Sequence, residues 1–228
     1  MISGRIIQST EDGSHTIAIP TMQITYHSKH GAMQESMHVF IKEGLHFVNE
    51  NVYPSNQTIH VFEAGFGTGL NALLSLQYAV QLNRKLSYET IEAFPLTIEE
   101  ISQLNYTSLL TEDLKHSFIA MHECEWNQTI QLHASFALKK IKADLQQFET
   151  AQKFHVIFFD AFDSNTQPEL WTENIFKKMF DMLYANGVLA TYCSKGIVQR
   201  VMKAAGFKIE KLKGPPGKRE IIRATKLN

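Results

Sequence analysis

The pattern of apolar and polar positions along the chain changes near residue 56. Beyond this point, short apolar runs of strand length occur at residues 59–63, 87–92, 136–143, 154–159 and 187–192. Segments with the length and spacing of helices lie between or after them, at residues 70–82, 95–104, 169–184 and 195–205. Such alternation predicts a mainly parallel sheet with helices on both faces, and the polar stretch after residue 104 predicts a helical insertion.

The last two strands are expected at residues 207–212 and 220–224, joined through Gly214-Pro215-Pro216-Gly217. A connection this short leaves no room for a crossover helix, so the two strands should form an antiparallel hairpin. We therefore expect a seven-stranded sheet that is mainly parallel and ends in this C-terminal hairpin.

The first 50 residues predict a small extension before the main domain, which we place at residues 51–228. Strand-like pieces occur at residues 5–8, 16–19 and 23–26, and turn residues such as Asp12-Gly13-Ser14 separate them. The segment 32–49 has apolar side chains at helical spacing, although Gly44 weakens that pattern. The extension at residues 1–50 is thus expected to be a β element followed by a helix.

A buried strand runs into a turn with Gly65, Gly67 and Gly69, and then into a helix. Glycines at alternate positions allow a tight turn and let backbone N–H groups approach a ligand that a Cβ would push away. The dinucleotide fingerprint has its third glycine one residue later, and the acidic Glu63 before the turn suits a cationic ligand better than a diphosphate. S-adenosylmethionine fits, because it carries a sulfonium, an ammonium and a ribose but no phosphate; a tight connection without a ligand is the alternative.

Four successive strands end in carboxylates, namely Glu63, Glu92, Asp144 and Asp160. In open α/β sheets ligands bind beyond the carboxyl ends of the strands, so these acids are candidate ligand contacts. Glu92 is placed to bind both ribose hydroxyls. Asp144 is placed to bind the adenine amino group or, alternatively, to start the following helix.

Asp160 ends the most apolar strand, residues 154–159. A carboxylate there can orient an amine nucleophile, accept its proton and stabilise the charge that develops on nitrogen during methyl transfer. The alternative is that Asp160 contacts only the methionine ammonium of the cofactor. Both interpretations stay open on the residues alone.

The net charge of −1 argues against a protein that binds nucleic acid through its overall charge. From Lys195 onward, basic residues outnumber acidic ones, which predicts either a local phosphate-contacting face or a set of solvated lysines. The two cysteines, Cys124 and Cys193, have no metal-ligand spacing, and the histidines form no metal motif. These patterns predict no metal site. No apolar run approaches the roughly 20 residues that span a bilayer, so we expect a soluble cytoplasmic protein.

Four motifs together resemble those of the tRNA 5-methylaminomethyl-2-thiouridine methyltransferase family, in its stand-alone form and as the methyltransferase half of its bifunctional form. They are Glu63-Ala64-Gly65-Phe66-Gly67-Thr68-Gly69-Leu70-Asn71, Phe159-Asp160-Ala161-Phe162, Pro168-Glu169-Leu170-Trp171-Thr172 and Gly214-Pro215-Pro216-Gly217-Lys218-Arg219-Glu220. Tyr26-His27-Ser28 and Glu35-Ser36-Met37-His38-Val39-Phe40 extend the match over nearly the whole chain. The resemblance implies the Rossmann-like class I methyltransferase fold with S-adenosylmethionine as cofactor.

The same resemblance implies methyl transfer to the amine of 5-aminomethyl-(2-thio)uridine at the wobble position, so that the partner is the anticodon loop of a tRNA. Asp160 would face the substrate amine and is the catalytic candidate. The cofactor contacts that the resemblance implies are Tyr26, Glu63, Gly65, Gly67, Asn71, Glu92, Asp144 and Asp160.

For the RNA, Phe162 and Trp171 are candidate walls of the wobble-base site, because unstacked bases are commonly held by aromatic faces. Helix packing is the alternative for Trp171. The basic residues expected nearest the anticodon phosphates are Lys195, Lys218 and Arg219.

The chain departs from the family pattern in places. Ala143 precedes Asp144 where glycine is usual, and Asp160-Ala161-Phe162-Asp163 carries an acid where many relatives have a small or apolar residue. No flavin-dependent half is expected in this chain, so another route would supply the aminomethyl substrate. We also expect the protein to be a monomer.

Three alternatives remain: a methyltransferase of this fold that acts on a small amine or a protein, an aminopropyltransferase-like enzyme, and a non-catalytic binding module. The basic C-terminal segment favours RNA over the first. An aminopropyltransferase usually needs further acids around its polyamine substrate, and no convincing set is found. The acids at all four strand ends argue against a non-catalytic binding module.

Overall fold

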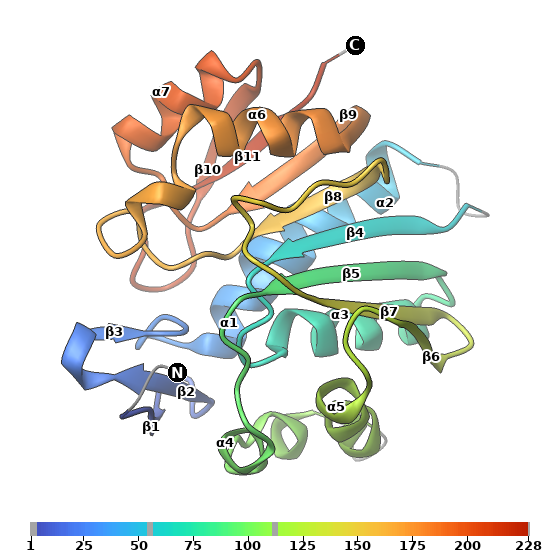
Figure 1. Ribbon diagram of the computed structural model, residues 1–228, viewed down its shortest axis with the longest axis vertical. Helices are drawn as coiled ribbons and strands as arrows, with labels where there is room; N and C mark the ends of the chain where they lie inside the picture. Colours follow the sequence, from blue (N-terminus) through green and yellow to red (C-terminus); the bar gives the residue numbers. More distant parts are fainter. Residues whose placement is uncertain (1–3, 54–56, 111–113, 228) are drawn as a thin grey trace.

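The fold of this computed structural model, which describes residues 4–53, 57–110 and 114–227, is built around an eight-stranded sheet (Figure 1). The strand order is β10-β11-β9-β8-β4-β5-β7-β6. The strands are β4 (Ile59–Ala64), β5 (Leu86–Glu92), β6 (Thr129–His133), β7 (Phe136–Lys142), β8 (Phe154–Phe159), β9 (Leu183–Thr191), β10 (Lys208–Lys213) and β11 (Glu220–Thr225). The five strands from β9 to β7 run parallel, and the β10–β11 hairpin joins antiparallel to β9, which confirms the predicted fold class.

Helices cover both faces of this sheet, because its central strands are apolar on both sides. In β8, Val156 and Phe158 belong to one core and Ile157 and Phe159 to the other. The first core is covered by α3 (Leu70–Gln81) and by the helical segment that precedes β4, and the second by α6 (Glu173–Met182) and α7 (Gly196–Ala204). Burial of β8 on both faces explains why its sequence is a continuous apolar run.

The helical segment before β4 consists of α1 (Ala32–Ser36), a π-helix (Met37–His46) and α2 (Phe47–Asn51). Gly44, which weakens the helical pattern in the sequence, is where this segment approaches the sheet. A Cβ on Gly44 would lie 3.1 Å from Phe158 Cε1 and 3.3 Å from the Ala190 Cβ. The segment therefore packs directly on β8 and β9, while the expected domain boundary near residue 50 stays a prediction.

A separate antiparallel sheet precedes this segment, with β1 (Ile6–Ser9), β2 (His15–Ile19) and β3 (Ile24–Thr25) in that order. This small sheet agrees with the β element expected at the N-terminus. Figure 1 shows it beside the end of the large sheet at which β4 and β8 finish. The loop after β3 therefore lies next to the carboxyl ends of the parallel strands.

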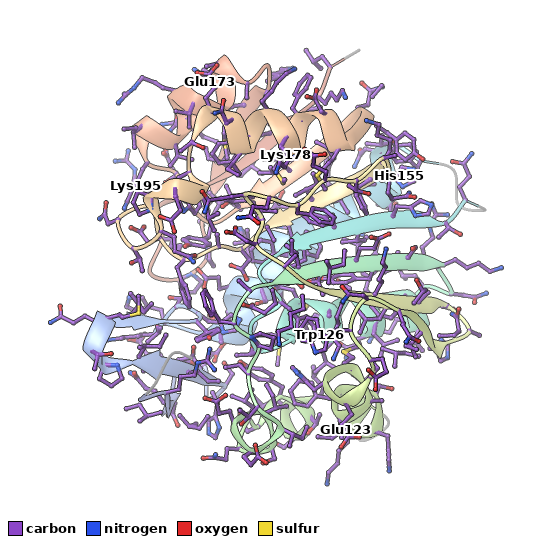
Figure 2. The ribbon with its side chains drawn as sticks, in the orientation of Figure 1. Glu123, Trp126, His155, Glu173, Lys178 and Lys195 are labelled. Carbon is purple, nitrogen blue, oxygen red and sulfur yellow. The ribbon has the colours of Figure 1, made fainter. Side chains whose placement is uncertain are left out.

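The insertion between β5 and β7 contains one strand more than expected. It comprises α4 (Ile98–Ser102), a 3₁₀ turn (Tyr106–Leu109), α5 (Leu114–Glu123) and β6, which pairs antiparallel with β7 at the sheet edge. Figure 2 shows Trp126 where α5 meets the sheet, and the Lys140 Nζ lies 4.7 Å from the centre of its ring. Because no residue of β6 is fully buried, the strand lacks the apolar run that marks the others.

Candidate cofactor and substrate site

A cavity of about 520 Å³ opens at the carboxyl ends of the parallel strands. Its walls come from the glycine turn after β4, from the loops after β5, β7 and β8, and from the end of the small sheet. The expected site residues that line it are Tyr26, Gly65, Gly67, Asn71, Glu92, Asp144, Asp160 and Phe162. The position agrees with the general rule that open α/β sheets bind ligands at this edge.

The glycine turn forms a wall of bare backbone. Gly65 and Gly67 have φ of 98° and 50°, in the region that favours glycine. A Cβ on Gly65 would lie 2.9 Å from the Asp160 carbonyl oxygen, and one on Gly67 would lie 3.1 Å from Tyr26 Cδ1. Side chains at these positions would thus collide with the loop after β8 and with Tyr26, so glycine brings both walls close to the turn.

Glu92 is held in place by two backbone donors. Its Oε2 accepts a hydrogen bond from Gly67 N at 3.0 Å, and its Oε1 accepts one from Phe94 N at 2.8 Å. A carboxylate has further lone pairs, so the half-buried Glu92 retains acceptor capacity toward a ligand in the cavity. Paired hydroxyl groups, such as those of a ribose, fit such an acceptor.

Asn71 connects two acids. Its Nδ2 donates to Glu63 Oε1 at 3.0 Å and to Asp160 Oδ2 at 2.8 Å. Glu63 is fully buried, also accepts a hydrogen bond from Thr90 Oγ1 at 2.9 Å, and does not belong to the lining of the cavity. Sequence reasoning expected Glu63 to touch the cofactor, whereas the structure places its carboxyl behind Asn71.

The two acids bridged by Asn71 both have raised pKa values. Burial raises the pKa of Glu63 to about 8, and the hydrogen bonds from Asn71 and Thr90 only partly oppose it. Burial also raises the pKa of Asp160 well above its usual range, and the nearby Glu35 and Glu63 add to this. A cationic ligand beside Asp160 would favour its carboxylate form.

Asp144 and Tyr26 both line the cavity. Asp144 is exposed, and its Oδ1 accepts a hydrogen bond from Gln146 N at 2.8 Å within a turn, so it does not start a helix. The Tyr26 ring meets the Phe162 ring edge-on at 5.0 Å between centroids. Tyr26 and Phe162 together form an aromatic wall made from the small sheet and the loop after β8.

Trp171 is packed in the core and does not line the cavity. It is 5% exposed and its ring contacts Phe159 and Phe176. Its Nε1 donates to the Phe162 carbonyl oxygen at 2.8 Å, so it supports the loop that carries the aromatic wall. Of the two alternatives for Trp171, packing is the one observed.

Two of the three basic residues expected at phosphates are engaged within the protein. Lys195 Nζ lies 2.6 Å from Asp163 Oδ1, and Figure 2 shows this residue on the side of the molecule where β8 ends. Lys218 Nζ lies 2.7 Å from Oε1 of the buried Glu35. Arg219 is exposed. Sequence reasoning did not assign a role to Glu35, because nothing in the local pattern signals a partner far along the chain.

The residues of the cavity fit S-adenosylmethionine. Asn71 Oδ1 is buried and has no hydrogen-bond donor among the described residues, and Asp160 is a half-buried acid on the cavity wall. An ammonium or sulfonium beside them would satisfy both. Gly65 and Gly67 leave space that a Cβ would fill, and Glu92 suits a ribose.

Residues 4–53, 57–110 and 114–227 hold no group of three or more His, Cys, Asp or Glu side chains that could bind a metal ion. Over the same part of the chain, no helix has the length and apolar character needed to cross a bilayer.

Comparison with known proteins gives consistent matches. A family model described as S-adenosyl-L-methionine-dependent methyltransferase matches residues 98–227. The tRNA 5-methylaminomethyl-2-thiouridine biosynthesis bifunctional protein MnmC of Leptospira interrogans is 30% identical over 207 residues, covering 86% of this chain and 32% of that protein. MnmC of Burkholderia mallei is 27% identical and covers 97% of this chain and 36% of that protein. The chain therefore spans about a third of the length of these relatives.

Solved structures show the same relationship. The crystal structure of MnmC2 from Aquifex aeolicus has a TM-score of 0.79 and 25% identity, covering 99% of this chain and 71% of that chain. Spermidine synthase from Thermotoga maritima has a TM-score of 0.60 with 14% identity, over 97% of this chain and 69% of that one, which shows a shared fold alone.

Proposed function

The chain belongs to the S-adenosyl-L-methionine-dependent methyltransferase family, and we propose that it methylates the amine of 5-aminomethyl-(2-thio)uridine at the wobble position of tRNA. The names of the MnmC relatives support the RNA substrate. The observation that carries the proposal is the half-buried acid Asp160 directly after the central strand β8, on the wall of a cavity that fits the cofactor.

Asp160 is the acid that receives the substrate amine. S-adenosylmethionine, when bound, supplies a methyl group from its sulfonium and leaves as a neutral thioether. The Asp160 carboxylate would accept the proton that the amine loses when its new nitrogen–carbon bond forms and the sulfur–carbon bond breaks. Because burial and nearby acids raise the pKa of Asp160, its carboxylate is a stronger base than an exposed one.

Other residues of the cavity would hold the cofactor and orient the reacting groups. Asn71 fixes the Asp160 carboxyl through its Nδ2, and its Oδ1, which is buried and has no donor among the described residues, would accept a hydrogen bond from the cofactor ammonium. Glu92 would bind the ribose hydroxyls and Asp144 the adenine amino group. Phe162, whose ring contacts that of Tyr26, would form the wall for the wobble base.

The test measures methyl transfer from labelled S-adenosylmethionine to tRNA that carries 5-aminomethyluridine. We expect transfer by the wild-type protein and a loss of at least about 100-fold in kcat for Asp160→Asn, which keeps the shape but not the base. Cofactor binding by the variant, measured by calorimetry, shows that the fold is intact.

Controls separate this proposal from the alternatives. Unmodified tRNA and tRNA with the carboxymethylaminomethyl group should not be methylated. Transfer to small amines or proteins instead of tRNA, or aminopropyl transfer from the decarboxylated cofactor to putrescine, would overturn the RNA substrate and leave the fold assignment unchanged.

A further inference from the structure

Lys218 is partly buried although it directly follows the turn of the C-terminal hairpin. Its Nζ lies 2.7 Å from Glu35 Oε1 and 3.8 Å from the centre of the Tyr192 ring. The side chains of Lys218 and Glu35 are 24% and 7% exposed. Lys211 and Glu220 form a pair at 3.2 Å on the same hairpin, but their side chains are 49% and 33% exposed. The hairpin thus carries one ion pair whose side chains are largely exposed and one whose side chains are mostly buried.

Glu35 ties three segments together. It lies in α1, its Oε1 meets Lys218 from the hairpin, and its Oε2 accepts a hydrogen bond from Ser28 N at 2.8 Å. Nearby, His38 Nε2 and the Lys213 carbonyl oxygen lie 2.7 Å apart, so a second contact joins the helical segment to the hairpin. Both charges of the Glu35–Lys218 pair have partners, which is what a buried ion pair requires.

This pair reaches the proposed reacting acid through Tyr192. The Tyr192 ring lies under the Lys218 ammonium, and its hydroxyl donates to the Ala161 carbonyl oxygen at 2.8 Å. Ala161 directly follows Asp160. The position of the hairpin and the position of the reacting loop are therefore coupled through one aromatic side chain.

The charges around Asp160 come from several elements. The carboxyls of Glu35 in α1 and Glu63 in β4 and the ammonium of Lys218 act on it. The phenols whose pKa values Asp160 itself raises are Tyr88, Tyr106 and Tyr192. Burial is the largest cause of the raised pKa of Asp160. Glu35 and Glu63 raise that pKa further, whereas Lys218 lowers it, as does the hydrogen bond from Asn71.

We propose that Glu35 and Lys218 are positioning residues of the methyl-transfer site, whose ion pair holds the hairpin turn and Tyr192 against the loop of Asp160 and balances the charge that Asp160 experiences. Lys218 thereby acts on Asp160. Of the basic residues expected at the RNA backbone, the exposed Arg219 and not Lys218 is then the one that contacts phosphate. The inference rests on the proposed function for the role of Asp160 in transfer, while the charge balance itself belongs to the free protein.

The two charges act on Asp160 in opposite directions, which a merely structural pair would not do. Titration of the ¹³C-labelled aspartate carboxyls by NMR in the cofactor-free protein measures this, and Asp160→Asn identifies the Asp160 signal. Lys218→Gln should move the Asp160 midpoint to higher pH and Glu35→Gln should move it to lower pH, each by about one unit. The acid limb of the pH profile of kcat/KM should move in the same directions.

Lys211→Gln is the matched control, since it removes a lysine from the same hairpin at an exposed pair. It should leave the Asp160 midpoint unchanged. The double variant Glu35→Gln/Lys218→Gln leaves neither charge unpaired in the interior, so it guards against a single variant that fails to fold. Its midpoint should lie between those of the two single variants.

Midpoints that stay at the wild-type value in both single variants, or that move in the same direction, would overturn the inference. So would a double variant whose midpoint lies beyond that of either single variant. If the midpoints move apart as expected but the wild-type protein methylates no tRNA, the effect of the two charges on Asp160 is confirmed and only the proposed tRNA substrate is rejected. If tRNA is methylated and the midpoints do not move, only the positioning role falls.

Discussion

The reacting end of the cavity is governed by one amide that serves two acids. Asn71 Nδ2 donates to both Glu63 and Asp160, so neither carboxyl has this donor to itself. Glu63 has no exposed surface, and an ion there is disfavoured by desolvation. The buried acid behind the cavity wall is consequently a neutral hydrogen-bonding group over much of the neutral pH range.

The pKa of Glu63 makes stability depend on pH. Burial raises that pKa from 4.5 to about 8 in the folded state, so the folded protein binds more protons than the unfolded chain between these values. Stability should therefore fall as pH rises through this window. Glu63→Gln, which keeps the shape without the charge, should remove part of this loss, on the order of a few kcal/mol above pH 8.

Urea unfolding at a series of pH values from 5 to 9 tests this. The stability difference between Glu63→Gln and wild type should grow with pH and then level. Asp12→Asn is the control: burial raises the pKa of Asp12, but its hydrogen bonds outweigh this and lower it, so the corresponding difference should stay constant over the range. A constant difference for Glu63→Gln as well would contradict the prediction.

At the scale of elements, the helical segment before β4 depends on close approach to the sheet. A Cβ on Gly44 would have three neighbours at 3.1 to 3.4 Å, from Phe158, Ala190 and Val156. Gly196, the first residue of α7, differs, because the nearest atom to its Cβ position is Arg200 Nη1 at 3.6 Å. Two helical glycines thus sit in opposite surroundings.

Alanine substitution at the two glycines should therefore have opposite effects. Alanine favours helix by up to about 1 kcal/mol over glycine, so Gly196→Ala should leave stability unchanged or raise it slightly. Gly44→Ala should lower stability by about 1 kcal/mol in spite of this preference, because the core must move. Thermal unfolding of both variants provides the measurement, and an equal rise in Tm for both would refute the packing argument.

Elements with a strong local signal could be predicted from the sequence. The apolar run of β8 and the glycine turn after β4 placed the cavity, and the rule about strand ends brought Glu92, Asp144 and Asp160 to its wall. β6 was missed because its half-buried and exposed residues alternate at a sheet edge without an apolar run. The pattern alone cannot distinguish such a strand from a polar loop.

Contacts between distant residues could not be predicted in this way. Glu63 follows an apolar stretch, and this pattern predicts a ligand contact. Only the fold shows that Asn71, which donates to Glu63, lines the cavity while Glu63 does not. The pairing of Glu35 with Lys218 likewise has no local signature, since it depends on the hairpin folding back onto α1. Sequence patterns therefore predicted most of the residues that line the cavity but not the charge pairs around it.

At the scale of the whole molecule, the small sheet and the large one are joined beside the cavity mouth by Arg5. This side chain is 6% exposed, and its Nη1 lies 3.2 Å from Glu100 Oε2. Its Nη2 donates to the Phe94 carbonyl oxygen at 2.9 Å, and its guanidinium lies 5.9 Å from the Tyr26 ring centre. One arginine thus connects the end of β5 with the aromatic wall.

Arg5→Met should loosen the small sheet while leaving the core of the large sheet intact. We expect the dissociation constant of S-adenosylmethionine to rise about tenfold, which corresponds to about 1.4 kcal/mol. Hydrogen exchange should speed up in β1 to β3 and stay slow in β4 and β8. Calorimetry and exchange mass spectrometry measure the two effects, and unchanged affinity with faster exchange would show that the small sheet does not close the cavity.

The strand order also sets the sequence of events during synthesis. β4 pairs with β5, which follows it closely along the chain, but its other edge is completed only by β8. A nascent chain that ends before residue 154 therefore exposes an unpaired apolar strand edge, which invites association with other chains. Asp160 directly follows β8 and Lys218 lies between β10 and β11, so both are synthesised only after the strand that completes this edge.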